Sequence, residues 1–125
     1  MSFLLDTHVL LWWLENSPKI KKNIRKTLEN PDNQVFVSSV SVWEIAIKRS
    51  LGKLEVPDNL LDQIRHHEFD ELPVRFQHAL FLEKIPNHHN DPFDRLLIAQ
   101  SIVEHLTFIT EDNQIKKYKN VKILA

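Results

Sequence analysis

Short apolar runs alternate along this chain with longer segments whose apolar residues recur at helical spacing, and this alternation limits the folds open to it. The runs at 3–5, 35–37, 106–110 and 121–124 are compact and rich in large aliphatic, β-branched or aromatic residues, which is typical of strands. Helical patterns lie between them. Strands that alternate with helices favour an α/β fold with a mostly parallel sheet and right-handed crossovers.

The expected helices are located by their apolar stripes and by the residues that begin and end them. Ser17-Pro18 predicts a helix start with proline at the first helical position, and Gly52 predicts a left-handed helix end. Asp91-Pro92 predicts the start of a strongly apolar helix that is buried on several sides. Further helices are expected after residue 6, after 38–41, from Pro57 and over 74–82, with a short strand within 68–72.

Size and charge restrict the classes of protein to which the chain can belong. Its 125 residues, 42% of them hydrophobic, suit one core, so we assign residues 1–125 to a single domain. Sixteen basic against seventeen acidic residues give a formal charge of −1, so no global basic field attracts nucleic acid. Any such contact must be local. The basic segment Lys19 to Lys26 could follow an RNA backbone, or could be only the solvated face of a helix.

Several kinds of site and location are excluded by what the chain lacks. Without cysteine there can be no disulfide, thiolate catalysis or Cys-ligated zinc. A single glycine excludes phosphate-binding loops and dinucleotide fingerprints. No run approaches the roughly 20 apolar residues that span a bilayer, and no signal-peptide pattern precedes Asp6. We expect a soluble, cytoplasmic protein without a membrane segment.

Four acidic residues stand where predicted strands and helices meet: Asp6, Glu44, Asp94 and Asp112. Each has a structural explanation, because helix N-termini favour acids through capping bonds and the macrodipole. Asp6 and Asp112 could cap the helices that follow them, and Asp94 could be the partner of a cap at Asp91. For Glu44 the alternatives are a capping box with the serine three residues earlier or an ion pair with the lysine four residues later.

The joint position of the four acids favours a metal site. Ligands of open α/β sheets gather beyond the carboxyl ends of strands, where Asp6 and Asp112 are expected. Glu44 and Asp94 lie early in two helices that could point their side chains to the same rim. Carboxylates crowded there would repel one another without a cation. Mg²⁺ or Mn²⁺ suits such oxygen ligands, and either ion supports hydrolysis of phosphodiesters by an activated water.

Four short segments contain these acids: Asp6-Thr7-His8, Ser41-Val42-Trp43-Glu44-Ile45, Asp91-Pro92-Phe93-Asp94-Arg95-Leu96 and Thr110-Glu111-Asp112. They resemble the successive motifs of PIN-domain proteins, and their order and spacing are similar to the toxin branch known as VapC-like. The similarity spans Phe3 to Leu124. It implies a three-layer α/β/α fold, a Mg²⁺- or Mn²⁺-dependent endoribonuclease activity on RNA, and a cognate antitoxin that blocks it.

The same resemblance implies roles for individual residues. The catalytic metal ligands would be Asp6, Glu44, Asp94 and Asp112, with Asp6 and Asp94 the most direct. Whether one or two ions bind stays open. Asp91 is expected to cap its helix, with contact to the metal through water as the alternative. Glu111 is the alternative to Asp112, and it is expected to face solvent if Asp112 is the ligand.

Arg95 and the aromatic residues have two possible roles each. The Arg95 guanidinium could hold an RNA phosphate, or could form a salt bridge with a neighbouring aspartate. The three tryptophans, Trp12, Trp13 and Trp43, are expected in the core, although an exposed one would suit a homodimer or antitoxin interface. The histidine pairs 66–67 and 88–89 lack the spacing of a zinc site and are expected in polar segments.

Two other functions compete with the toxin hypothesis. In a PIN-like binding module the acids would only cap helices and the surface would bind proteins. A metal-dependent nuclease of general RNA or DNA processing would use the same site on other substrates. The identity of the RNA cannot be predicted, because specificity depends on loops and surface shape.

Overall fold

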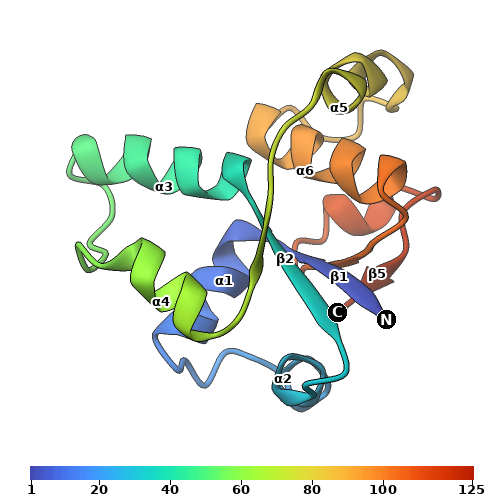
Figure 1. The fold of residues 1–125 in the computed structure, drawn as a ribbon. Coiled ribbons are helices and arrows are strands. Elements are labelled where there is room, and N and C mark those ends of the chain that lie inside the picture. Colours follow the sequence, from blue (N-terminus) through green and yellow to red (C-terminus); the bar gives the residue numbers. More distant parts are fainter.

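The computed structural model covers residues 1–125 and is built on a five-stranded sheet in the order β3-β2-β1-β4-β5 (Figure 1). Every strand pair is parallel, which confirms the predicted sheet type. In the centre, Phe3 of β1 is paired with Val35 on one side and with Thr107 on the other. The strands are β1 Ser2–Leu5, β2 Gln34–Ser38, β3 Asp70–Leu72, β4 Thr107–Ile109 and β5 Ile123–Leu124.

Helices cover both faces of this sheet. They are α1 Thr7–Leu14, α2 Lys22–Glu29, α3 Ser39–Ser50, α4 Leu60–His66, α5 Phe76–Phe81 and α6 Pro92–Val103, with 3₁₀ turns η1 Leu82–Lys84 and η2 Ile115–Lys117. In Figure 1, α1, α2 and α4 lie on one side of the sheet, and α5 and α6 lie on the other. None of the helices combines the length and apolar composition that a membrane crossing requires.

The two faces arise from the alternation of side chains along each strand. In β1, Phe3 and Leu5 join a core with Ile24 of α2, whereas Leu4 joins a second core with Leu97 of α6. Both leucines of β1 are at most 1% exposed, as expected for a parallel strand covered on both faces. Two cores separated by one sheet make three layers, so the predicted α/β/α architecture is confirmed.

Local signals located most helix ends correctly. Gly52 has φ +70°, its N–H donates to Arg49 O at 3.1 Å, and the N–H of Lys53 donates to Lys48 O at 2.9 Å. These two bonds form the Schellman ending that the lone glycine predicts. At the start of α6, Asp91 Oδ1 accepts from the backbone N–H groups of Phe93 at 2.8 Å and Asp94 at 3.1 Å, so the capping role of Asp91 is confirmed.

Two predicted helix starts were too early. The helix expected at Ser17-Pro18 begins only at Lys22, because Ser17 Oγ accepts from Lys19 N at 3.2 Å and closes a local turn instead. Ile20 is nevertheless buried, so the apolar stripe enters the core before the helix starts. The helix expected from Pro57 likewise begins three residues later, at Leu60.

The chain order of the strands creates a topological switch point between β1 and β4. From β1 the chain moves outward to β2 and β3, then returns to β4 on the other side of β1. Where the direction reverses, the connections leave β1 and β4 on opposite faces, and in open α/β sheets ligands bind beyond the carboxyl ends of strands at such a switch point. Asp6 follows β1 directly, and Thr110 to Asp112 follow β4.

Candidate metal centre

Asp6 lies at the carboxyl end of β1 and points toward β4. It occupies the cap position of α1, but its side chain makes no capping bond, so the capping interpretation is wrong. Its Oδ2 accepts a 2.7 Å hydrogen bond from the hydroxyl of Thr110. The same hydroxyl oxygen accepts from the backbone N–H of Asp112 at 3.1 Å. Thr110 therefore positions the carboxylate after β1 against the loop after β4.

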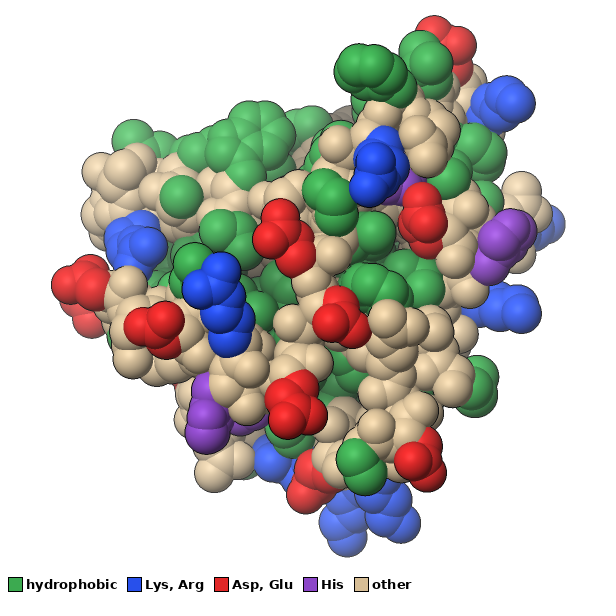
Figure 2. All heavy atoms as spheres, viewed as in Figure 1, with side chains coloured by type: hydrophobic (Ala, Val, Ile, Leu, Met, Phe, Trp, Pro, Cys, Tyr) green, Lys and Arg blue, Asp and Glu red, His purple; other side chains and the backbone are tan.

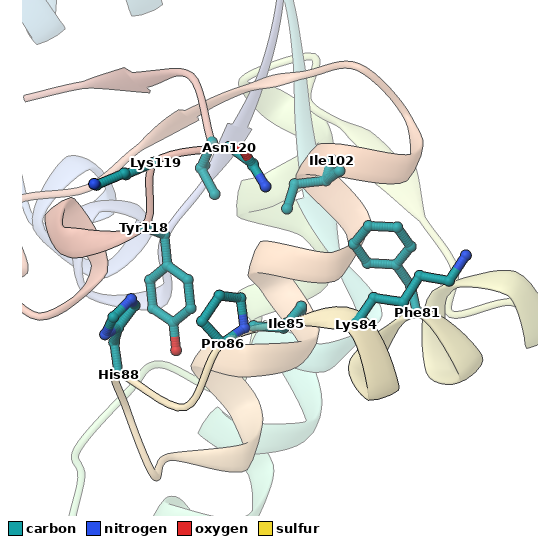
Figure 3. A pocket seen from close by; sticks show the side chains of 10 residues that line it. Phe81, Lys84, Ile85, Pro86, His88, Ile102, Tyr118, Lys119 and Asn120 are labelled. Carbon is teal, nitrogen blue, oxygen red and sulfur yellow. The ribbon is translucent and has the colours of Figure 1, made fainter.

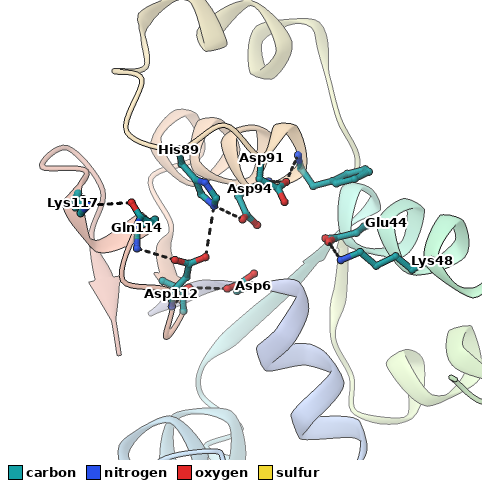
Figure 4. A network of polar contacts seen from close by, with 11 residues as sticks. Asp6, Glu44, Lys48, His89, Asp91, Asp94, Asp112, Gln114 and Lys117 are labelled. Carbon is teal, nitrogen blue, oxygen red and sulfur yellow. Dashed lines mark hydrogen bonds and ion pairs between the residues drawn. The ribbon is translucent and has the colours of Figure 1, made fainter. Parts of the chain in front are cut away.

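Asp94 and Asp112 meet at a histidine that the sequence hypothesis did not include. His89 Nε2 lies 2.7 Å from Asp94 Oδ2 and 3.7 Å from Asp112 Oδ2 (Figure 4). One ligand atom from each of the three side chains falls within 4.8 Å of the others, a grouping that could hold a metal ion. Asp112 also keeps a local role, because its Oδ1 accepts from Gln114 N at 2.8 Å before η2.

Glu44 is buried in α3 and forms an ion pair within its own helix. Its side chain is 4% exposed, and Oε2 lies 2.7 Å from Nζ of Lys48, one turn later. The capping box with Ser41 does not form: Ser38 caps the helix, and Ser41 Oγ accepts a 2.8 Å hydrogen bond from the hydroxyl of Thr7. Of the two structural alternatives for Glu44, only the Lys48 pair is present.

The structure thus brings Asp94 and Asp112 together at His89, places Asp6 within electrostatic reach of both, and sets Glu44 at their margin. Asp6 interacts electrostatically with both Asp94 and Asp112. In Figure 4, Glu44 and Lys48 lie to the right of Asp94 and Asp6. The hydrogen bond to Glu44 is the main cause that raises the pKa of Lys48, and the charge of Asp94 contributes. The Glu44–Lys48 pair therefore borders the same negative cluster.

The electrostatics of this cluster fit a bound cation. Burial, reinforced by the charges of Asp6 and Asp91, raises the pKa of Asp94 to about 7. Burial also raises the pKa of Asp6, which is 3% exposed. Among the four predicted acids, two buried carboxylate oxygens have no hydrogen-bond partner: Asp6 Oδ1 and Glu44 Oε1. Such orphaned acceptors are rare in folded proteins, and a divalent cation would both satisfy and neutralise them.

Arg95 and Glu111 have other contacts than those expected. The Arg95 guanidinium donates to the carbonyl oxygens of Pro86 at 3.2 Å, Leu82 at 3.4 Å and Ile85 at 3.5 Å, and no salt bridge with an aspartate forms. Its contact with substrate stays a prediction. Glu111 was expected to face solvent, but its side chain is only 18% exposed and Oε1 lies 3.8 Å from Lys21 Nζ.

The two adjacent histidines of the loop before α6 point to different surroundings. Whereas His89 faces the acids, His88 packs edge-on against Tyr118, with ring centroids 5.1 Å apart. His88 and Tyr118 line a cavity of about 370 Å³ that none of the four acids reaches (Figure 3). His89 stands two residues before Asp91, the cap of α6, so its position in the sequence could have suggested that it lies near the acids. The direction of its side chain, however, depends on the fold of the loop.

Comparison with known proteins identifies the family to which this chain belongs. The PIN domain family model matches residues 3–121. The chain belongs to the PIN domain family. The resemblance found in the sequence motifs is therefore confirmed at the level of the family.

Relatives of this PIN domain carry VapC and VapBC names. Ribonuclease VapC22 of Mycobacterium tuberculosis is 24% identical over 121 residues, which cover 94% of this chain and 92% of that protein. VapBC2 of Rickettsia felis, solved bound to a DNA fragment from its promoter, contains a chain with TM-score 0.74 and 13% identity, covering 99% and 98% of the two chains. DNA-bound VapBC of Salmonella typhimurium has TM-score 0.74 and 18% identity, covering 99% and 97%. These solved structures support the PIN-like fold.

Proposed function

We propose that this PIN-domain protein is a Mg²⁺- or Mn²⁺-dependent endoribonuclease and the toxin of a type II toxin–antitoxin system. The observation that carries the proposal is the crowding of Asp6 and Asp94 beyond β1 and β4, with raised pKa values and an orphaned Asp6 Oδ1. Groups with perturbed pKa values gather at functional sites. The similarity to a protein named as a ribonuclease points to RNA as the substrate class.

Each residue of the cluster has a defined part in this proposal. Asp6 and Asp94 hold the metal directly, while Asp112 and Glu44 complete the site or hold waters. When bound, Mg²⁺ or Mn²⁺ supplies an activated water and neutralises charge on the phosphate. Thr110 fixes the direction of the Asp6 carboxylate through its 2.7 Å bond. Lys48, beside Glu44, adds a positive charge at the margin where a phosphate backbone can approach.

A cleavage assay with purified, antitoxin-free protein tests the activity. Structured RNA, single-stranded RNA and DNA are each incubated with Mg²⁺, Mn²⁺ or EDTA, for the wild type and for Asp6→Asn and Asp94→Asn. We expect cleavage of RNA that EDTA abolishes and that either substitution reduces by about 100-fold or more, because the substitutions remove metal ligands. Cleavage that survives EDTA and both substitutions would sink the metal hypothesis. Cleavage of DNA alone indicates a DNA nuclease, and no cleavage favours a binding module.

We further propose a cognate antitoxin as the partner that blocks this site. The support is that similar structures are VapBC toxin–antitoxin complexes. The test is to express the chain with the product of an adjacent small gene and to purify the complex. We expect a stable complex without RNA cleavage, with activity restored when the partner is removed by denaturation and refolding. An adjacent product that neither binds nor inhibits contradicts the toxin role but leaves the nuclease intact.

A homodimer is the expected oligomer, and an exposed apolar surface supports it. Apolar side chains gather over α3 and α5, while Lys and Arg side chains are scattered over the same face (Figure 2). Trp43 is 56% exposed, contrary to its expected core position, and Phe76 and Leu80 are 88% and 64% exposed. Apolar groups gathered in this way mark interfaces. Sedimentation velocity should show a wild-type dimer that Phe76→Ser dissociates, whereas Leu51→Ser, at the far end of α3, should not.

A further inference from the structure

We propose that His89 is a ligand of the metal in this centre through Nε2, so that the site is a mixed carboxylate and imidazole site. The inference rests on the proposed metal centre and goes beyond its four acids. The observation behind it is that His89 Nε2 lies between Asp94 Oδ2 and Asp112 Oδ2, at 2.7 Å and 3.7 Å. His89 is the only histidine of the chain in this grouping.

The spacing of these atoms suits a single octahedral ion. With metal–ligand bonds of about 2.1 Å, neighbouring ligand atoms lie roughly 3 Å apart and opposite ones roughly 4.2 Å apart. The three atoms lie within 4.8 Å of one another. The 2.7 Å distance from His89 Nε2 to Asp94 lies near the value for neighbouring ligands, and the 3.7 Å distance to Asp112 lies between the two values. The three side chains are therefore close enough together to share one ion.

The loop that carries His89 is held in place from both sides. Arg95 of α6 donates to the carbonyl oxygen of Pro86 at 3.2 Å and so ties the loop to the first turns of its own helix. His88 is packed on Tyr118 in the opposite direction. His89 itself is only 18% exposed, so it is directed at the acids rather than free in solvent. A ligand supplied from a restrained loop loses little freedom when the metal binds.

An imidazole ligand changes which metal the site prefers. Carboxylates alone suit Mg²⁺, whereas imidazole nitrogen favours first-row transition ions, whose affinities rise from Mn²⁺ to Cu²⁺ and fall again at Zn²⁺. We therefore expect the wild-type centre to bind Mn²⁺ more tightly than Mg²⁺. Glutamine at position 89 removes the nitrogen ligand and leaves the carboxylates, so it should reduce Mn²⁺ affinity by about tenfold or more. The affinity for Mg²⁺ should change much less.

Pulsed electron paramagnetic resonance of the Mn²⁺-loaded protein tests the ligand directly. We expect echo modulation from a bound ¹⁴N in the wild type and in His88→Gln, with its loss in His89→Gln. Calorimetry on the three proteins measures the Mn²⁺ and Mg²⁺ affinities, and circular dichroism checks their folding. If the wild type binds Mn²⁺ but shows no ¹⁴N modulation, and His89→Gln binds Mn²⁺ with unchanged affinity, then His89 is not a ligand although the metal centre stands. No Mn²⁺ binding in the wild type overturns the metal centre and the ligand together.

Discussion

The hydroxyl of Thr110 donates a 2.7 Å hydrogen bond to Oδ2 of Asp6 and thereby joins the carboxyl ends of β4 and β1 across 104 residues of sequence. Burial raises the pKa of Asp6, and this hydrogen bond acts in the opposite direction by stabilising the carboxylate. Removing the donor leaves a buried acceptor unsatisfied. We expect Thr110→Val to lower the free energy of unfolding by about 1–3 kcal/mol.

Urea denaturation in EDTA measures this effect, with Thr110→Ser as the matched control because serine keeps the hydroxyl. Serine should recover most of the lost stability, and its Mn²⁺ affinity should remain near that of the wild type. Equal losses in the two variants contradict a role for the hydrogen bond and indicate that packing of the threonine methyl group dominates.

The raised pKa of Asp94 makes the metal-free protein less stable at higher pH. Its pKa is about 7 in the fold against 3.8 for the free side chain, so the folded state binds more protons between these values. Unfolding free energy therefore falls as pH rises through this window. From pH 5 to pH 8 we expect a loss of roughly 2 kcal/mol in EDTA, which saturating Mn²⁺ reverses.

Comparison with Asp94→Asn isolates this contribution from other titrating groups. Asparagine removes the charge, so the variant in EDTA should be more stable than the wild type at pH 8 by about 1–2 kcal/mol, although it lacks a proposed metal ligand. The measurement is urea denaturation of both proteins over the pH range. Parallel stability curves for the two proteins contradict the assigned pKa.

Lys48 compensates the buried charge of Glu44 when no metal is present. Lys48→Met leaves the Glu44 carboxylate, 4% exposed, with neither oxygen paired. Because Lys48 is 42% exposed, we expect a loss of only about 1–2 kcal/mol in EDTA, which is less than for a fully buried pair. Lys26 is an exposed lysine of α2, so Lys26→Met serves as the control. Its free energy of unfolding should equal that of the wild type. If Lys48→Met has the same free energy of unfolding as the wild type, the pair has no stabilising role.

Metal removal should lower the melting temperature of the wild type. A divalent ion at about one hundred times its dissociation constant adds about 2.7 kcal/mol, equivalent to about 10 °C for a chain of this size. Differential scanning calorimetry with Mn²⁺ and with EDTA measures the shift. In Asp6→Asn the shift should disappear, because the substitution removes a proposed direct ligand. A full shift in that variant indicates that the ion binds elsewhere.

Local sequence signals predicted those features that depend on neighbouring residues. The alternation of strand-like and helical segments indicated the parallel α/β sheet, and Gly52 and Asp91 located two helix ends through bonds within a few residues. The four acids were recognised because they stand at element boundaries within family-like motifs. Ser17 shows the limit of such signals, since its hydroxyl closed a turn in place of capping a helix.

The direction of each side chain depended on contacts that no local pattern contains. The sequence suggested that Asp6 caps a helix, but its side chain accepts from Thr110 instead, because β4 pairs with β1. The loop before α6 aimed His89 at Asp94, and Trp43 remained exposed because α3 buries its other face. Periodicity indicates which segments form strands and helices, because the spacing of apolar side chains within a segment favours one conformation over the other. The hydrogen bonds of the helices are local, whereas those of the strands join distant segments. The meeting of carboxylates and imidazole depends on chain crossovers that bring distant segments to one edge of the sheet.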